Sequence, residues 1–259
     1  MNYEKELKAA LDVAKLASEN IMKYYHDGFE VEIKEDDSPV TIADKSTDTL
    51  IRAYLSKLFP GYAFLTEESI DDKERLKYDY VWTIDPVDGT CDFVEKDDQF
   101  TCNIALVYKH EVVLGVVAIP AMNEVYYAVK GEGAYVVRDG KTTKIHVNDK
   151  TSDLNCLVSV FHCGNNEKEL IKKYSDRIKH VNKVGSSIKA CRIAEGQAEI
   201  TYRLSDGTKE WDTAAFQIIV EEAGGHVLKL DGSIIKYNRE DVVNRGGYIV
   251  VNRKENVLL

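Results

Sequence analysis

The stretch Asp85-Pro86-Val87-Asp88-Gly89-Thr90 directly follows a short apolar run, Tyr80–Ile84, that predicts a buried strand. Two carboxylates three residues apart on a tight turn can converge on one side, with the Val87 carbonyl between them. Hard cations such as Mg²⁺ prefer oxygen ligands of this kind. If a helix begins just after, the amides of Gly89 and Thr90 form a phosphate-binding site. The alternative is a surface turn, because Asp-Gly is also a common hairpin signal.

Two further acidic spots lie far from this stretch in the sequence. Glu67-Glu68 follows the apolar run Tyr62–Leu65 at an expected strand end, and Asp212 stands at an expected helix start. Each has an ordinary explanation, since Glu67-Glu68 could be a solvated edge and Asp212 could cap its helix. Taken together, three acidic sites at the ends of elements could build a centre of two or three metal ions, which would activate a water and stabilise a leaving oxygen.

Length and composition are those of an ordinary globular protein. The 259 residues are 44% hydrophobic and 30% charged, enough for one large domain or two lobes with buried cores. The net charge of −10 disfavours a nucleic-acid surface but not an anionic substrate, because a bound cation reverses the local field. The sequence has no apolar run of roughly 20 residues and no signal peptide, so we expect a cytoplasmic protein without a transmembrane segment. The five cysteines lack C-x-x-C spacing and indicate reduced thiols.

The pattern of hydrophobic residues changes along the chain. It predicts helices over 3–25 and 42–58, separated by a polar loop or hairpin at 34–39, and then strands from Tyr80 to about Val137. In the second half, strands at 157–161, 199–202, 227 and 248–251 alternate with helices at 168–174, 187–195 and 211–223. We therefore expect one domain over 1–259, divided into an α+β lobe at 1–150 and an α/β lobe at 151–259.

Three motifs in this order resemble the inositol monophosphatase-like superfamily of magnesium-dependent phosphatases. They are Leu65-Thr66-Glu67-Glu68-Ser69, the stretch from Asp85 to Thr90, and Trp211-Asp212-Thr213-Ala214-Ala215. The resemblance implies an αβαβα layered sandwich of the sugar-phosphatase type, with the active site between two lobes. It also implies a magnesium centre of two or three ions and allows for a homodimer. The implied metal ligands are Glu67, Asp85, the Val87 carbonyl, Asp88 and Asp212.

The resemblance also implies how water would be activated. The family uses an aspartate in a segment similar to Pro39-Val40-Thr41-Ile42-Ala43-Asp44, paired with the threonine of the D-P-x-D-G-T motif. Here the pair would be Asp44 and Thr90, acting as general base on a water that attacks phosphorus in line. The Gly89 and Thr90 amides would hold the phosphate. The alternative reading of Asp44 is a helix cap.

Within the superfamily, the chain looks most like the bacterial 3'(2'),5'-bisphosphate nucleotidases, which convert adenosine 3',5'-bisphosphate to AMP. By this resemblance, Ser159, His162, Gly185 and Lys189 would bind substrate, with Lys189 favouring a second phosphate. His162 could instead be a surface residue and Lys189 a solvated helix lysine. The chain also departs from the branch, with Cys91 in place of a lysine and Val160-Phe161 in place of Arg-Ser. Both departures put the nucleotide contacts in doubt.

Two other functions stay open at this point. One is a phosphatase for inositol 1-phosphate or another sugar phosphate, which a substrate panel would distinguish. The other is a non-catalytic metal- or nucleotide-binding regulator. A regulator would be expected to lose catalytic residues, whereas this sequence retains them all.

Overall fold

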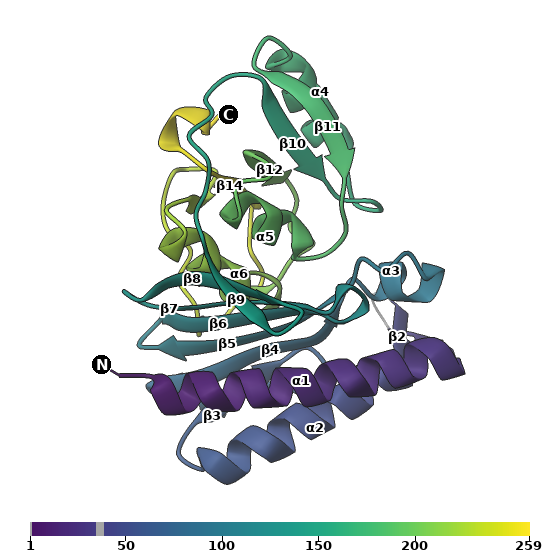
Figure 1. Cartoon of the computed structure of the whole chain (residues 1–259). Coiled ribbons are helices and arrows are strands. Elements are labelled where there is room, and N and C mark those ends of the chain that lie inside the picture. Colours follow the sequence, from purple (N-terminus) through teal and green to yellow (C-terminus); the bar gives the residue numbers. More distant parts are fainter. Residues whose placement is uncertain (1, 35–38) are drawn as a thin grey trace.

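The computed structural model describes residues 2–34 and 39–259, and these residues form five stacked layers (Figure 1). From bottom to top the layers are two helices, a large sheet, two further helices, a second sheet and one helix. Three apolar cores hold the layers together, one below the large sheet, one between the sheets and one above the second sheet. The predicted αβαβα layered sandwich is confirmed.

The bottom layer consists of α1 (Glu4–Asp27) and α2 (Ile42–Leu58), which pack side by side against the large sheet. Small side chains on the buried stripe of α1, such as Ala10 and Ala14, are fully covered. At the start of α2, Thr41 and Asp44 form a reciprocal capping box that fixes where the helix begins. This cap places Asp44 at the end of the sheet where the acidic motifs lie.

Seven strands form the large sheet. Across the sheet they are β3 (Ala63–Thr66), β4 (Tyr80–Asp88), β5 (Thr101–Tyr108), β6 (Glu111–Ile119), β7 (Glu124–Val129), β8 (Gly133–Arg138) and β9 (Lys141–Ile145). Both faces of the central strands β4, β5 and β6 are buried. β3 and β4 are parallel, so their carboxyl ends meet at one edge. Along β4, Trp82 and Ile84 face the bottom helices while Val81 faces the middle layer, as strand alternation requires.

The middle layer consists of α5 (Ile188–Ala194) and α6 (Glu210–Glu222). α6 lies across the large sheet at close range, and Gly115 of β6 makes this approach possible. A Cβ at Gly115 would lie 2.3 Å from the Ala215 carbonyl oxygen and 2.6 Å from Ile218 Cγ2. Glycine therefore sets the depth at which α6 sits and, with it, the position of the acidic residue in its first turn.

The second sheet has the strand order β11 (Ile178–Lys183), β10 (Leu154–Val158), β12 (Ile200–Arg203), β14 (Tyr248–Val251) and β13 (His226–Lys229). Its outer face packs against α4 (Asn165–Lys173). The short elements are β1 (Val31–Ile33), β2 (Pro39–Thr41), α3 (Thr90–Glu95) and the 3₁₀ helices η1 (Glu74–Lys77), η2 (Pro120–Met122) and η3 (Lys254–Asn256).

Most predicted elements are found, with some differences. The strand expected at 157–161 instead spans Leu154–Val158, and β9 and β11 were not predicted because their residues are mostly exposed and polar. Of the predicted loop or hairpin at 34–39, residues 35–38 lie outside the described chain, while β1 and β2 on either side pair antiparallel. The division into lobes at residue 150 stays a prediction.

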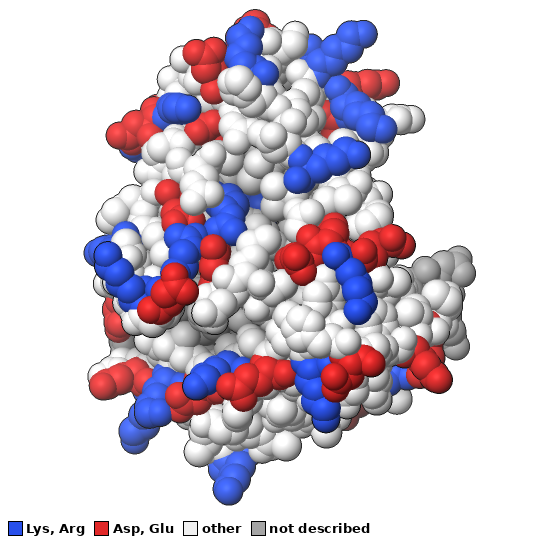
Figure 2. Space-filling view, turned by 45° about the vertical axis from the view of Figure 1, so that its right-hand side comes forward, with Lys and Arg blue, Asp and Glu red and all other residues white. Residues whose placement is uncertain are grey.

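The surface of the described residues carries charges of both signs. Figure 2 shows acidic and basic side chains interspersed on the face that it draws. None of the helices in the described ranges is both long and apolar enough to span a bilayer.

Candidate active site

The segment from Asp85 to Asp88 forms the end of a strand and not the tight turn that was expected. β4 continues through Asp88, and Asp85 lies opposite Asn103 of β5 while Asp88 lies opposite Thr101. Three steps on β4 therefore match two on β5, which is a β-bulge with one extra residue. In a strand without a bulge, side chains three residues apart point to opposite faces of the sheet. The bulge brings both carboxylates to the face of the middle layer.

Four hydrogen bonds fix one oxygen of Asp88. Its Oδ2 accepts from the Ser187 amide at 2.7 Å and hydroxyl at 2.8 Å, from Thr101 Oγ1 at 3.0 Å and from Asn103 Nδ2 at 3.3 Å. Asn103 also donates to Ser187 Oγ at 2.9 Å. Asp88 is thus held in one orientation before any ligand binds. No prediction from the sequence included Ser187, Thr101 or Asn103, although Ser187 lies between Gly185 and Lys189, which were both expected to bind substrate.

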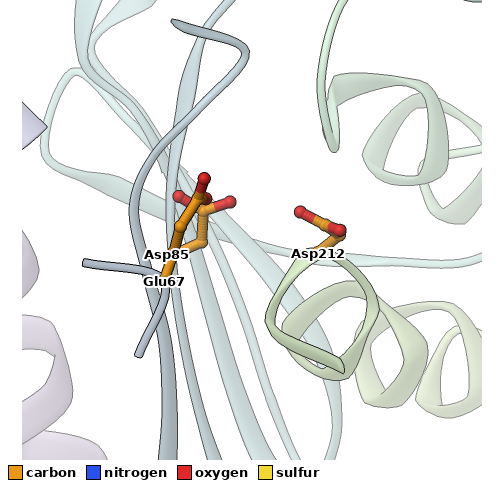
Figure 3. Close-up of side chains that lie close together, drawn as sticks. All are labelled: Glu67, Asp85 and Asp212. Atoms are coloured by element: carbon orange, nitrogen blue, oxygen red, sulfur yellow. The ribbon is translucent and has the colours of Figure 1, made fainter. Parts of the chain in front are cut away.

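Three acidic side chains from distant parts of the sequence meet beside this strand end (Figure 3). Glu67, Asp85 and Asp212 each offer one carboxylate oxygen, and these oxygens all lie within 4.8 Å of one another. Glu67 follows β3, Asp85 lies on the adjacent β4, and Asp212 comes from the first turn of α6 on the other side of the gap. The structure therefore brings together the acidic motifs that the sequence could only place on separate elements.

The charges of this cluster are poorly compensated. Burial raises the pKa of Asp85 well above its ordinary value, and the charges of neighbouring carboxylates, Glu67 first, raise it further. Burial and then the charge of Asp88 raise the pKa of Asp212 in the same way. Asp85 Oδ2 is buried with no hydrogen-bond partner in the described chain. An unpartnered buried carboxylate oxygen among other carboxylates fits a divalent cation.

A lysine side chain approaches the cluster from the hairpin side. Lys34 Nζ lies 2.9 Å from Glu67 Oε1 and 2.5 Å from Glu68 Oε1. The Lys34 ammonium neutralises part of the charge of Glu67, and it also forms an ion pair with Glu68. Asp85 and Asp212 remain the members whose ionisation is most costly.

Asp44 and Thr90 lie in direct contact. Thr90 Oγ1 is 3.1 Å from Asp44 Oδ1 and 3.2 Å from the Val87 carbonyl oxygen. The other carboxylate oxygen of Asp44 accepts from the Thr41 amide at 2.8 Å and the Thr41 hydroxyl at 2.6 Å. The carboxylate therefore caps α2 with one oxygen and holds the Thr90 hydroxyl with the other, so the helix cap and the pairing with Thr90 are both present, while the general-base role stays a prediction. Burial raises the pKa of Asp44.

Gly89 links the acidic strand end to α3. Its φ of +88° lies in the left-handed region that glycine tolerates best. A Cβ there would meet Asp92 Oδ2 at 3.1 Å and Ser186 Cβ at 3.2 Å. The backbone thus turns tightly at the mouth of the site, and Thr90 is the first residue of the short helix α3.

A cavity of about 380 Å³ opens beside the carboxylates. Ser159, His162 and Lys189 line it, but Gly185 is not among its described lining residues. Gly185 instead packs against Asp92 and Gln99, where a Cβ would approach Asp92 Oδ1 to 2.5 Å. Lys189 Nζ donates to the Ser186 carbonyl at 2.7 Å and the Val184 carbonyl at 3.3 Å. Burial lowers the pKa of Lys189 to about 8.

The same cavity has polar groups that the sequence analysis did not single out. Arg203 of β12 lines it, and in the described chain its Nε is buried without a partner, as are Ser186 Oγ and Thr201 Oγ1. Lys209 also lines the cavity, with its Nζ 5.3 Å from the centre of the Trp211 ring. No motif in one sequence marks these residues, because the second sheet has to fold before they face the carboxylates.

A five-layered fold, a carboxylate cluster and a hydroxyl held by a buried aspartate together define a class of enzyme, and the comparisons agree that the chain is a phosphatase. The family model described as "Inositol monophosphatase family" matches residues 2–258, so the chain belongs to the inositol monophosphatase family.

Relatives with assigned names point to one branch of the family. The 3'(2'),5'-bisphosphate nucleotidase CysQ of Escherichia coli strain K12 is 36% identical over 245 residues, covering 93% of this chain and 97% of that protein. CysQ of Salmonella typhimurium is 34% identical over 249 residues, covering 95% and 99%.

Solved structures agree with the family assignment. The crystal structure of CysQ from Bacteroides thetaiotaomicron superimposes with a TM-score of 0.84 at 33% identity, covering 97% of this chain and 99% of that one. An IMPase from Thermotoga maritima has a TM-score of 0.81 at 28% identity, covering 96% and 92%.

Proposed function

We propose that the chain is a magnesium-dependent 3'(2'),5'-bisphosphate nucleotidase that converts adenosine 3',5'-bisphosphate to AMP and phosphate. The observation behind the proposal is one cavity with two chemically different walls. One wall, the catalytic wall, consists of carboxylates suited to cations. The other, the basic wall, presents Arg203, Lys209 and unpartnered hydroxyls. A substrate with one phosphate to be cleaved and a second to be held matches this division. The names of the CysQ relatives support the same substrate.

The metal centre would use the ligands implied by the family resemblance. Glu67, Asp85, Asp88, Asp212 and the Val87 carbonyl would hold two or three Mg²⁺ ions. Bound Mg²⁺ would supply charge neutralisation and polarisation of the phosphoryl oxygens. The fit rests on the unpartnered Oδ2 of Asp85 and on the raised pKa values of Asp85 and Asp212, both of which describe a cluster lacking a counter-charge.

Proton transfer from the attacking water would pass through Thr90. Its hydroxyl can take a proton from water while giving its own to Asp44 Oδ1, 3.1 Å away. The burial that raises the pKa of Asp44 makes this carboxylate a stronger base than an exposed aspartate. The Gly89 and Thr90 amides would bind the phosphate oxygens. As the P–O bond to the nucleoside breaks, its electron pair goes to the ester oxygen, which takes up a proton from solvent and becomes the hydroxyl of AMP, and phosphate is released.

The second phosphate would lie on the wall formed by α5 and β12. Ser186 Oγ, Thr201 Oγ1 and Arg203 Nε are buried donors without partners in the described chain. Buried donors normally have partners, so these three favour an anionic ligand. His162 and Ser159 line the same cavity and would contact the nucleoside. The homodimer and the cytoplasmic location stay predictions.

Inositol and sugar monophosphates form the second candidate substrate class. The likeness to the Thermotoga maritima IMPase favours it, because that structure shares the fold at 28% identity. The same catalytic wall would serve both classes, so the basic wall is what distinguishes them.

A substrate panel tests the proposal. Phosphate release is measured from adenosine 3',5'-bisphosphate and from inositol 1-phosphate, with Mg²⁺ and with a chelator. We expect much faster release from the bisphosphate and none without metal. Preference for inositol 1-phosphate would replace the substrate assignment.

The Asp88→Asn variant tests the catalytic wall itself. We expect it to fold normally, because the amide carbonyl oxygen can still accept the hydrogen bonds from Ser187. We expect it to lose turnover, because the NH₂ group replaces the charged oxygen that would bind metal. A folded variant that retains wild-type activity would refute the assignment of Asp88.

A further inference from the structure

A buried polar network begins at the first residue of α6, two positions before Asp212. The Glu210 carboxylate is completely buried and accepts from the Asn238 amide at 2.6 Å and the Arg239 amide at 2.8 Å. Arg239 Nε lies 3.1 Å from the same carboxylate. These bonds tie the start of α6 to the 238–239 segment, which runs beside it.

The network continues to the segment that follows Glu67. Arg75 of η1 is 2% exposed, and its Nη1 donates to Asn238 Oδ1 at 2.8 Å. Its Nη2 donates to the Arg239 carbonyl at 2.9 Å and to Asp71 Oδ2 at 2.7 Å. Asn238 Nδ2 donates back to the Arg75 carbonyl at 3.3 Å. Arg75, Asn238 and Glu210 therefore connect the Glu67 segment to the start of α6 without touching the cavity.

The carboxylate cluster gives this connection a task. Asp212 reaches the cluster from α6, whereas Glu67 and Asp85 come from β3 and β4. Before a cation binds, carboxylates within 4.8 Å of one another repel when they are ionised, and this repulsion favours moving the helix start away from the sheet. Between Glu67 and Arg75 the chain is mostly exposed, with Ile70 98% exposed. Bonds that cross from this segment to α6 oppose that separation.

We propose that the network of Arg75, Asn238 and Glu210 sets the distance between Asp212 and the Glu67–Asp85 pair, and so sets the affinity of the site for divalent cations. Arg75 is then a positioning residue that acts through Asn238 and Glu210. The proposal rests on the proposed metal-dependent function. Partners behind metal ligands typically change metal affinity or activity by about 10- to 100-fold when removed.

The test measures Mg²⁺ binding to the full chain by titration calorimetry, without substrate. Arg75→Met keeps much of the side-chain length but loses every hydrogen bond of the guanidinium, and we expect its Kd for Mg²⁺ to rise by about 10-fold or more. Arg75→Lys retains the charge and some of the bonds, so an intermediate Kd is expected. Half-saturation of phosphatase activity by Mg²⁺ should shift in parallel, with a smaller change in KM measured at saturating Mg²⁺.

Arg177→Met is the matched control. Arg177 also bridges segments, through the Glu255 carbonyl at 2.9 Å, the Thr151 carbonyl at 2.7 Å and Asn256 Oδ1 at 2.6 Å, but these partners lie in η3 and in the segment before β10, and none of them lines the cavity. We expect Arg177→Met to lower the melting temperature. Its Kd for Mg²⁺ should stay within about twofold of the wild-type value, well below the change expected for Arg75→Met.

Two results would overturn the proposal. One is a folded Arg75→Met variant that binds Mg²⁺ like the wild type, and the other is an equal loss of affinity in Arg177→Met. If Arg75→Met does not fold, Arg75→Lys and Asn238→Ala decide by the same measurement. A wild type that binds Mg²⁺ but prefers inositol 1-phosphate would refute the proposed substrate and leave the positioning role intact, since calorimetry requires no substrate.

Discussion

Replacing Arg203 by methionine tests whether the basic wall holds a second phosphate. Arg203 lines the cavity, and its buried Nε has no partner in the described chain, so a phosphate there would gain a charge-assisted hydrogen bond. Such bonds contribute about 1.5–3 kcal/mol. Because Arg203 is only half-buried, we expect the lower end of the range, which corresponds to about 10-fold in kcat/KM.

The assay compares kcat/KM for adenosine 3',5'-bisphosphate and adenosine 3'-monophosphate, which lacks the second phosphate. The Arg203→Met variant should lose about 10-fold on the bisphosphate and little on the monophosphate. Arg203→Lys keeps the charge and should retain most of the preference. Equal losses on both substrates would refute the reasoning, since they would indicate a structural role, for instance through the hydrogen bond from Nη1 to the His162 carbonyl.

Two other predictions concern stability. Gly115→Ala should destabilise the protein by about 1–3 kcal/mol in urea unfolding, because its Cβ would lie 2.3 Å from the Ala215 carbonyl oxygen, whereas Gly61→Ala, with open space around it, should have little effect. The metal-free protein should melt at lower temperature as pH rises from 5 to 8, because burial raises the pKa of Asp85 and Asp212, so the folded state holds protons that the unfolded chain releases. Saturating Mg²⁺ should weaken or reverse this trend, and a melting temperature that rises with pH without metal would contradict the assignment.

The catalytic wall could be predicted from the sequence because its residues lie in short, contiguous motifs. Asp85 and Asp88 stand in one hexapeptide, and Glu67 and Asp212 stand at the expected ends of elements. The family resemblance supplied the choice of Glu67 over Glu68 and the pairing of Asp44 with Thr90. What the hexapeptide could not show was that the strand continues through it, because a bulge is a property of two paired strands.

The basic wall was harder to predict, because its position at the cavity depends on how the second sheet and α5 pack. Lys189 was expected to bind a second phosphate; it lines the cavity, its ammonium donates to two backbone carbonyls, and its role stays a prediction. Arg203 and Thr201 lie in a short strand that contains no recognisable motif. The antiparallel pairing of this strand with β14 and the position of α5 bring the two residues to the cavity. Edge strands such as β11 escaped detection for a related reason, because exposed polar residues lack the alternation that marks a strand.

The extra residue in β4 has a consequence for how this protein can vary. Inserting one residue into β5 between Thr101 and Asn103 would match the three steps of β4, restore the regular pleat and turn the Asp88 carboxylate downward, among the apolar side chains beneath the sheet. A side chain such as Val87 can be exchanged gradually, but the paired segment of β5 cannot gain one residue without dismantling the site. Its length should therefore be inherited more strictly than its composition.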